Sequence, residues 1–398
     1  MLRSLFSGIS GLRAHQTMLD VTGNNIANVN TTGFKASQTQ FQDALSQELQ
    51  GAGAAQQGTG GTNPAQVGLG VRIAGITTNF TQGPNQMTGR STDMMIQGDG
   101  FFVVRRGAET YYTRAGSFDF DATGQMVLPG DGALVQGWAA VGGAVDTTQP
   151  LTDLRVPAGT LMDAAATTGA SYEGNLDAGA ADGTQLHREI EIYDAQGAKR
   201  VLDLEFTKAA GAWSVRASDD AQAATPTWTA ATAVTFGADQ KLTAPLTLAT
   251  AGGIDVDLSA VTGFAGIDTL KALDQDGHAA GTLQAFALGA DGTLSGAFSN
   301  GLKQVLGRLA LANFTNPAGL EKAGGSLFRT SVNSGVIQLG TPGSGGRGTL
   351  AGGSLEMSNV DLSSEFTNLI VAQRGFQANS RVVTTSDEVL QELVNLKR

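Results

Sequence analysis

Residues 359–398 read NVDLSSEFTNLIVAQRGFQANSRVVTTSDEVLQELVNLKR, and this stretch decides the architecture of the chain. It contains no proline and one glycine, Gly375. Its apolar residues recur in steps near three and four, the spacing of a stripe along one side of a helix. The sequence therefore predicts a long C-terminal helix, with Ser363 or Ser364 as its N-cap. The residues of this stripe that we expect to pack are Leu362, Phe366, Leu369, Ile370, Phe376, Val383, Leu390 and Leu393.

The first thirty residues carry a matching stripe, so each end of the chain is predicted to be an amphipathic helix. The simplest partner for each helix is the other one, in a parallel or an antiparallel coiled coil. A helix of 35 residues is about 50 Å long, which is more than one small domain needs, so we expect a role in assembly. The alternative is a single helical hairpin that uses both termini and has no role in assembly. The N-terminal packing residues are Leu2, Leu5, Phe6, Ile9, Leu12 and Leu19.

Composition excludes several functional classes. The chain of 398 residues has 25 basic and 36 acidic side chains, a formal charge of −11, and no cluster of Lys or Arg. Nucleic acid is therefore not an expected partner, because binding its backbone requires neutralising phosphates. Cysteine is absent, which excludes disulfides, thiolate metal sites and cysteine nucleophiles. The 55 glycines favour short strands and tight turns.

No segment is predicted to insert into a membrane. The chain has no run of about eighteen apolar residues, the length a spanning helix needs. The N-terminal segment MLRSLFSGISGLRAHQ is interrupted by serine, glycine and arginine, and it lacks a cleavage site of the A-x-A type. We therefore expect no cleaved secretory signal, and export, if it occurs, by another route.

Between the terminal helices the residue pattern changes several times. Asparagines 24, 25, 28 and 30 with Gly33 predict that the first helix ends in an ordered polar turn. Residues 36–49 regain helical character around Phe41, Leu45 and Leu49, and residues 51–61 (GAGAAQQGTGG) are expected to be a linker. Strands are predicted at 71–76, 94–96, 101–104, 118–120 and 126–128.

Residues from about 151 to 284 form a second block of strands. Alternating apolar residues at 190–193 and 201–206, followed by Trp213 and Val215, predict an antiparallel β-domain with one solvated face. The pattern of the first block of strands then returns at 283–288 and 305–314. The chain therefore contributes to the first block of strands twice, once before and once after the second block.

Patterns that suggest chemistry are weak. The three histidines, at 15, 187 and 278, are too far apart to predict a triad or a zinc site. Residues 274–277 (DQDG) lack the glutamate that completes a calcium loop, and residues 343–348 (GSGGRG) match G-x-G-x-x-G without a βαβ unit. We expect no catalytic, metal or cofactor site, and no enzyme.

Five separate motifs resemble the bacterial flagellar rod and hook proteins. Residues 25–35 (NIANVNTTGFK) are similar to the family's N-terminal signature, and 358–362 (SNVDL) with 370–381 (IVAQRGFQANSR) to its C-terminal one. Residues 96–104, 112–118 and 310–320 are similar to its first β-domain, whereas 151–284 carry no recognised motif. The motif residues of interest are Asn25, Ala27, Asn28, Thr31, Gly33, Phe34, Lys35, Gln373, Arg374 and Asn379.

The resemblance implies a multidomain, mainly β fold with α-helical termini that form a coiled-coil assembly domain around nested antiparallel β-domains. The expected parts are the assembly domain at 1–30 and 360–398, a connecting segment at 31–70 and 345–359, an inner β-domain at 71–150 and 285–344, and an outer β-domain at 151–284.

In function, the resemblance implies an extracellular subunit of the flagellar hook, a curved tube of identical copies that works as a universal joint between rod and filament. Length and the hook-like residues 61–70 favour the hook over the distal rod. Implied partners are further copies, the rod, hook-cap and hook–filament junction proteins, and the flagellar type III export apparatus, which exports the uncleaved chain. A secreted β-rich adhesin or glycan-binding protein is the alternative from another class, and exposed clustering of Trp138, Trp213 and Trp228 would favour it.

Overall fold

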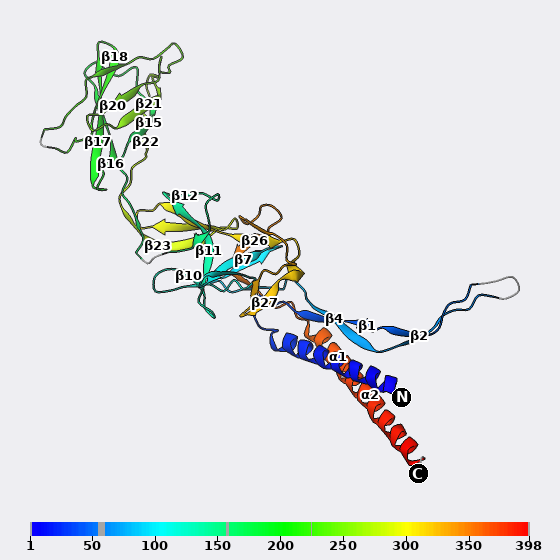
Figure 1. The fold of residues 1–398 in the computed structure, drawn as a ribbon. Coiled ribbons are helices and arrows are strands. Elements are labelled where there is room, and N and C mark those ends of the chain that lie inside the picture. Colours follow the sequence, from blue (N-terminus) through cyan, green and yellow to red (C-terminus); the bar gives the residue numbers. More distant parts are fainter. Residues whose placement is uncertain (1, 55–59, 157–158, 224, 397–398) are drawn as a thin grey trace. The chain divides into compact units, whose positions relative to one another are not determined.

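The computed structural model describes residues 2–54, 60–156, 159–223 and 225–396 (Figure 1). It confirms a mainly β chain with an α-helix at each end. The contacts divide the chain into two compact units, which are described separately below. Unit 1 comprises Met1–Pro157, Phe286–Ser295 and Val305–Arg398, and unit 2 comprises Ala158–Ala285 and Gly296–Gln304.

The terminal helices of unit 1 are α1 (Leu2–Ala27) and α2 (Leu362–Asn395). With 34 residues, α2 is about 50 Å long. Its N-cap is Asp361, whose carboxylate accepts hydrogen bonds from the backbone N–H of Ser363 at 2.9 Å and of Ser364 at 3.5 Å. The predicted serine cap is therefore wrong, because both serines lie inside the first turn and supply the donors that a cap must satisfy.

Residues 37–54 and 60–78 form a two-part hairpin after α1. Strand β1 (Ser37–Asp43) pairs antiparallel with β4 (Val71–Thr78), and β2 (Ser46–Gln50) pairs with β3 (Ala65–Gly68). The helical character expected for 36–49 is wrong. The order SQTQFQD alternates with period two, and pairing with β4 outweighs a few apolar residues at helical spacing.

The expected linker at 51–61 is also corrected. Gly53 and Thr62 exchange two backbone hydrogen bonds of 3.0 Å, so these residues continue the hairpin, and residues 55–59 lie outside the described part.

The β-domain of unit 1 is built around β7 (Phe101–Arg106), which is buried on both faces. Phe102 and Val104 join a core with Ile96 and Phe118, while Phe101 and Val103 face a second core with Trp138. Strand β7 lies between β11 (Ala133–Val141) and β8 (Glu109–Thr113). The remaining elements are β5 (Asn85–Met87), β6 (Met94–Gln97), β9 (Asp119–Phe120), β10 (Met126–Leu128), β12 (Ala144–Val145), β13 (Thr152–Asp153), β25 (Lys303–Leu309), β26 (Leu311–Phe314), η1 (Pro317–Gly319), β27 (Glu321–Gly324), β28 (Leu327–Arg329), β29 (Ile337–Gly340), β30 (Thr349–Gly352) and β31 (Ser354–Glu356).

Unit 2 has one core between two four-stranded sheets. One sheet has the order β20-β21-β15-β22 and the other β16-β17-β18-β19. Strands β16, β17 and β18 pair antiparallel as expected, but β15 and β21 run parallel. A purely antiparallel domain is therefore wrong. The connection from 176 to 254 is long enough to return the chain in the same direction.

The bounds in unit 2 are β14 (Leu161–Met162), β15 (Gly169–Asn175), β16 (Gln185–Tyr193), β17 (Lys199–Ala209), β18 (Ala212–Ser218), β19 (Thr232–Val234), β20 (Thr247–Ala249), β21 (Asp255–Thr262) and β22 (Lys271–Gln275). Strands β23 (Gly281–Leu288) and β24 (Thr293–Phe298) contain residues of both units, and so does β25, whose first two residues, Lys303 and Gln304, belong to unit 2.

Candidate assembly site at the paired ends of the chain

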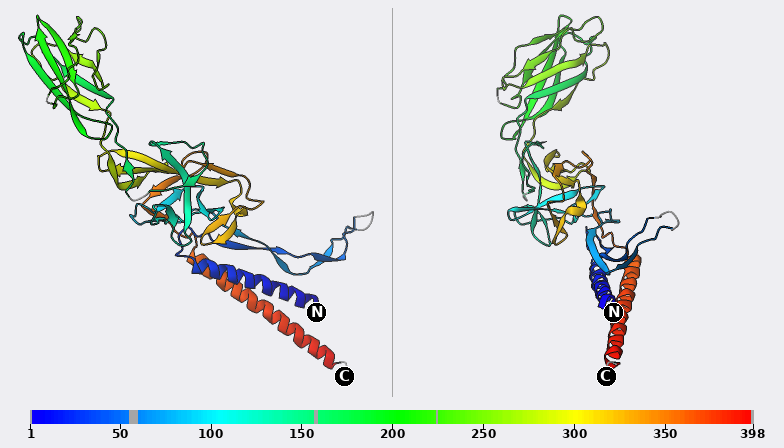
Figure 2. Two further views of the ribbon diagram at one scale, coloured as in Figure 1. Left: turned by 60° about the vertical axis from the view of Figure 1, so that its left-hand side comes forward. Right: turned by 45° about the vertical axis from the view of Figure 1, so that its right-hand side comes forward.

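The two terminal helices pack on each other antiparallel, a direction that the sequence left open (Figure 2). Near one end of the pair, Gly8 lies so close to α2 that an added Cβ would be 3.3 Å from Cγ2 of Val383. Near the other end, the Asn25 amide donates a hydrogen bond of 3.1 Å to the carboxylate of Glu365. Residue numbers therefore rise along one helix and fall along the other.

Glycines allow the helices to approach closely in the middle of the pair. A Cβ at Gly11 would lie 2.5 Å from the Asn379 side chain, and one at Gly375 would lie 2.5 Å from the His15 ring. Real Cβ atoms essentially never approach so closely. We call Gly8, Gly11 and Gly375 the glycine seam. The contact between the helices thus depends on missing side chains as well as on apolar ones.

The predicted packing residues divide into two groups. In a single copy Leu5, Ile9, Leu12, Leu19, Leu369, Val383 and Leu390 are half-buried, and the side chain of Leu2 lies outside the described part. Six others are exposed: Phe6, Leu362, Phe366, Ile370, Phe376 and Leu393, with exposed fractions from 38% for Phe376 to 63% for Phe6. Val371, Val382 and Val389 of α2 are exposed as well. One copy therefore leaves much of the apolar surface of α2 in water.

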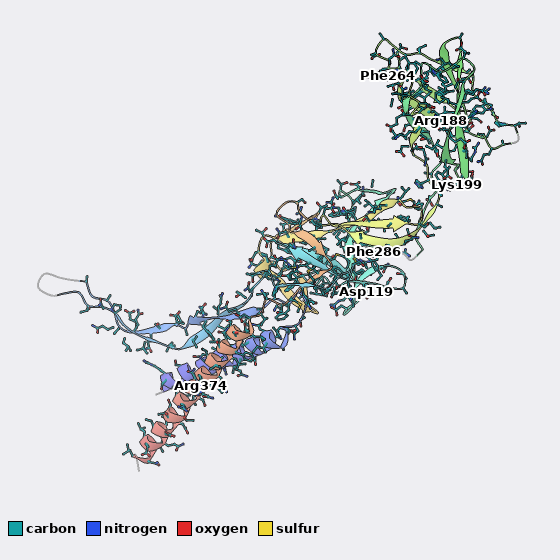
Figure 3. The ribbon with its side chains drawn as sticks, turned by 180° about the vertical axis from the view of Figure 1, so that it is seen from behind. Asp119, Arg188, Lys199, Phe264, Phe286 and Arg374 are labelled. Atoms are coloured by element: carbon teal, nitrogen blue, oxygen red, sulfur yellow. The ribbon has the colours of Figure 1, made fainter. Side chains whose placement is uncertain are left out.

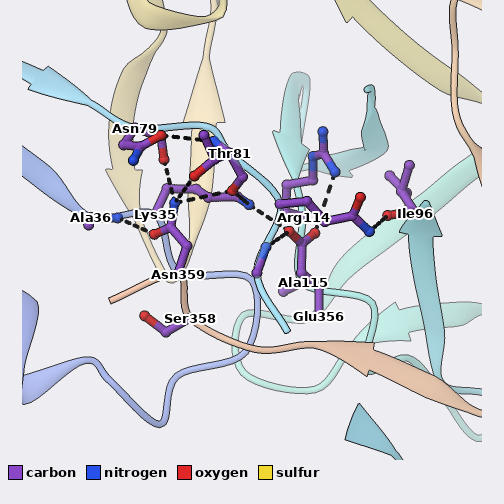
Figure 4. Close-up of polar contacts among 12 residues, drawn as sticks. Lys35, Ala36, Asn79, Thr81, Ile96, Arg114, Ala115, Glu356, Ser358 and Asn359 are labelled. Atoms are coloured by element: carbon purple, nitrogen blue, oxygen red, sulfur yellow. Dashed lines mark hydrogen bonds and ion pairs between the residues drawn. The ribbon is translucent and has the colours of Figure 1, made fainter. Parts of the chain in front are cut away.

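At the base of the helices, a buried ion pair ties the two ends of the chain to the β-domain (Figure 4). The Lys35 ammonium lies 2.6 Å from a carboxylate oxygen of Glu356, and neither side chain is exposed. Arg114 approaches the second oxygen at 3.4 Å. The Gly83 backbone N–H donates to Glu356 at 2.9 Å, and Lys35 donates to the Thr81 carbonyl at 2.7 Å. Burial lowers the pKa of Lys35, and the charge of Glu356 opposes that shift.

Asparagines complete this junction. The Asn359 side chain accepts from the Ala36 N–H at 2.8 Å and donates to the Asn79 carbonyl at 2.9 Å. Asn25 exchanges two hydrogen bonds with the backbone of Ser37, of 2.8 and 3.0 Å. A side-chain amide that both donates and accepts suits these positions, because each bridges a backbone N–H and a carbonyl.

The other motif residues lie around the junction or on the helices. Gly33 has a φ of 66° and sits against Ala115, so only glycine fits there. Phe34 lies under the Lys322 ammonium, 5.0 Å from the ring centre. Asn28 and Thr31 bond within the turn, and Asn379 donates to the Gly375 carbonyl. Ala27, Gln373 and Arg374 are exposed, and Arg374 is labelled on α2 in Figure 3.

Sequence reasoning missed Glu356, the centre of the ion pair. Its only sequence signal is a carboxylate between Leu355 and Met357, in a segment that is otherwise apolar or small. Arg114 lay within a recognised motif, but nothing in the sequence indicated that it would be buried.

The candidates for other chemistry do not assemble into a site. His187 pairs with Asp203 at 2.8 Å, whereas His15 lies in the helix pair of the other unit. Residues 343–348 form a turn that leads into β30. The carboxylate of Asp276 accepts from the backbone of Thr168 and Gly169. Within the described residues no group of three or more His, Cys, Asp or Glu side chains is placed to hold a metal ion, and no helix is long and apolar enough to cross a membrane.

The tryptophans do not form the exposed cluster that a glycan-binding surface would need. Trp138 and Trp213 are buried, with exposed fractions of 5% and 3%. Trp228 is half-buried, with the Arg216 guanidinium 4.7 Å from its ring centre. The observation that would have favoured an adhesin is therefore not met.

Four family models match the chain. The flagella basal body rod protein model matches residues 5–35, and the C-terminal model of the basal body rod FlgEFG proteins matches 351–396. The D1 domain model of the flagellar hook protein FlgE/F/G matches 95–178. The D2 domain model of the flagellar basal body protein FlaE matches 160–278. This last match corrects the expectation that residues 151–284 carry nothing recognisable.

Similar proteins cover the chain from end to end. Flagellar hook protein FlgE of Treponema pallidum is 38% identical over the whole of both chains. Flagellar basal-body rod protein FlgG of Bacillus subtilis is 35% identical, again over the whole of both. A crystal structure of Helicobacter pylori flagellar hook protein FlgE2 covers 68% of this chain and 100% of its own, with a TM-score of 0.53 and 17% identity. That structure supports the fold alone.

Proposed function

The chain belongs to the family of flagellar hook and basal-body rod proteins, and on that premise we propose that it is the hook subunit. Identical copies would polymerise into a curved, flexible tube that transmits torque from the rod to the filament as a universal joint. The role is structural, and the proposal assigns the chain no catalysis and no cofactor.

The observation that carries the proposal is the apolar surface left open on α2. Phe366, Ile370 and Val371 each expose more than half of their surface in one copy, although α1 already packs on the same helix. Burying an apolar side chain contributes about 1.5–3 kcal/mol. Packing this surface against the terminal helices of other copies would stabilise a polymer and leave the β-strands of each copy unchanged.

The proposed partners follow from this role. They are further copies of the chain, the rod at one end of the tube, and the hook-cap and hook–filament junction proteins at the other. The flagellar type III export apparatus would deliver the chain outside the cell without cleaving it. The four-part division into assembly domain, connecting segment, inner β-domain and outer β-domain is part of the same proposal.

Electron microscopy of basal bodies from the source bacterium tests the assignment. In a strain that lacks the gene, we expect complete rods without hooks, and gold-labelled antibody against the restored protein should decorate the curved segment. Rods that stop short in the deletion strain, with label on the straight segment, would contradict the hook assignment.

That second outcome would identify a distal rod subunit, the alternative within the family. Length does not separate the two, contrary to the expectation from sequence, because the Bacillus subtilis rod protein aligns over its entire length with this chain. The hook assignment therefore depends on the hook proteins among the relatives and on this experiment.

A further inference from the structure

Strand β29 and the turn before it form an exposed apolar edge on unit 1. Leu339 and Ile337 of β29 have exposed fractions of 46% and 36%, and Val336 and Val332 just before it have 81% and 107%. No charged residue occurs between Thr330 and Gly346. We call residues 331–340 the β29 edge.

The backbone of β29 is open along one side. Among the described residues it pairs only with β26, where Ala312 faces Leu339 and Phe314 faces Ile337. Proteins usually protect such edges with lysine, proline, a bulge or a covering segment, because unpaired N–H and C=O groups recruit other strands. The register of β26 and β29 has no bulge, and the β29 edge has neither lysine nor proline.

The turn that presents the two valines is held by side-chain hydrogen bonds. The Ser334 hydroxyl donates to the Ser331 carbonyl at 2.8 Å, and the Ser331 hydroxyl donates to the Gly319 carbonyl at 2.5 Å. Asn316 donates to the Asn333 carbonyl at 2.9 Å, and Ser334 is fully buried. An ordered surface binds a partner at a lower entropic cost than a mobile loop does.

We propose that the β29 edge is an interface between copies of this chain and receives an extended segment of a second copy by backbone pairing. The open N–H and C=O groups supply hydrogen bonds, and the exposed valine, isoleucine and leucine side chains pack on the incoming segment. The inference rests on the proposed polymer, because the polymer brings copies into contact.

Composition selects a second copy over other partners. Nucleic acid and anionic lipid surfaces are bound through clusters of basic side chains. Residues 331–340 contain none, and the single guanidinium beside them, that of Arg347 against Gly340, donates to the Thr341 carbonyl and the Ser344 hydroxyl. A strand of four residues spans only about 13 Å, too little to hold two proteins together alone. The β29 edge is therefore an added contact within an assembly that the terminal helices hold together.

Thiol labelling tests the proposal, because the chain has no cysteine and one introduced thiol is unique. We would make Leu339→Cys in the full-length chain and, as the matched control, Val141→Cys at the end of β11, which is 85% exposed. Each variant is treated with a maleimide as monomer and as polymer. We expect the thiol at 339 to react at least about tenfold more slowly in the polymer, and the thiol at 141 to be nearly unaffected.

A charge variant gives an independent readout. Leu339→Lys should raise the critical concentration for assembly about tenfold or more, with thermal unfolding unchanged, whereas Val141→Lys should leave both unchanged. Equal labelling at 339 in monomer and polymer, or equal slowing at both positions, would overturn the β29 edge and leave the hook proposal standing. If the unmodified chain forms no polymer at all, the hook proposal itself fails.

Discussion

Lys35 and Glu356 lie 321 positions apart in the sequence, yet their charged groups meet at 2.6 Å with no exposure to solvent. One residue follows the N-terminal helix and the other precedes the C-terminal helix. The ion pair thus fixes both helix bases on one β-domain. A buried pair of this kind is costly to break from either side, because the remaining charge stays desolvated.

Glu356→Gln should destabilise unit 1 by about 3–5 kcal/mol, because Lys35 and Arg114 would lose their shared counter-charge. Equilibrium denaturation in urea measures this change. The matched control is Glu321→Gln, which removes an exposed ion pair with Arg329 and should cost no more than about 1 kcal/mol. Equal costs for the two variants would show that the buried pair does not fix the junction.

Gly375→Ala should weaken the helix pair although alanine is the better helix former. The added Cβ meets the His15 ring at 2.5 Å, so the helices must separate or His15 must move. Gly23→Ala in α1 is the matched control, because nothing lies within 4 Å of its Cβ position, and it should stabilise α1 by up to about 1 kcal/mol. Circular dichroism at 222 nm during thermal unfolding distinguishes the two. A stabilising effect at both positions would contradict the close packing at Gly375.

Phe376→Ala tests whether the exposed helix surface drives polymerisation. Phe376 lies on α2, belongs to neither core of the β-domain and is 38% exposed in one copy, so the loss of its ring should leave the unfolding of the β-domain unchanged. In the polymer, truncation of a buried aromatic costs about 3–5 kcal/mol, enough to raise the critical concentration by two orders of magnitude or more. Sedimentation and negative-stain microscopy measure assembly. Ser364→Ala, which leaves the Asp361 cap intact, should form tubes normally, and normal tubes from Phe376→Ala would refute the role of this surface.

Glu365 should make the helix pair more stable in mild acid. Burial raises the pKa of this carboxyl above its usual 4.5, and the charge of Asp361 adds to the shift, while hydrogen bonds from Asn25 and Thr22 oppose it. A raised pKa in the folded state stabilises the fold below the unfolded value, and this contribution is lost as pH rises through the folded value. Melting curves between about pH 4 and 7, compared with those of Glu365→Gln, isolate the effect. The difference between the two proteins should grow with pH, and a constant difference would contradict it.

The sequence allowed the terminal helices to be predicted, because apolar residues continue at helical spacing over about thirty positions. It also allowed the turn after α1 to be predicted, since asparagines and Gly33 interrupt that pattern. It did not allow β1 to be predicted, because Gln38, Gln40 and Gln42 alternate on a strand that is held in place by pairing with β4 and by contacts with α1, neither of which its own sequence shows.

The candidate site was harder to predict. The apolar stripe identified Leu369 and Val383 as packing residues. The glycine seam could not be predicted, because the need for glycine at 375 depends on where His15 lies in the other helix. Glu356 was missed for the same reason. The burial of a charged residue such as Glu356 can be predicted only when the partner that neutralises it, here Lys35, is known to lie beside it.

The antiparallel pairing of α1 and α2 also sets the order in which the chain can fold. Asn25 and its partner Glu365 are separated by 340 positions, so α1 cannot pair with α2 until nearly the whole chain is available. Contacts of such long sequence separation form slowly, because a long loop must close before any stabilising contact is made. If the proposed export delivers the chain N-terminus first, α1 stays unpaired until nearly all of the chain has been delivered.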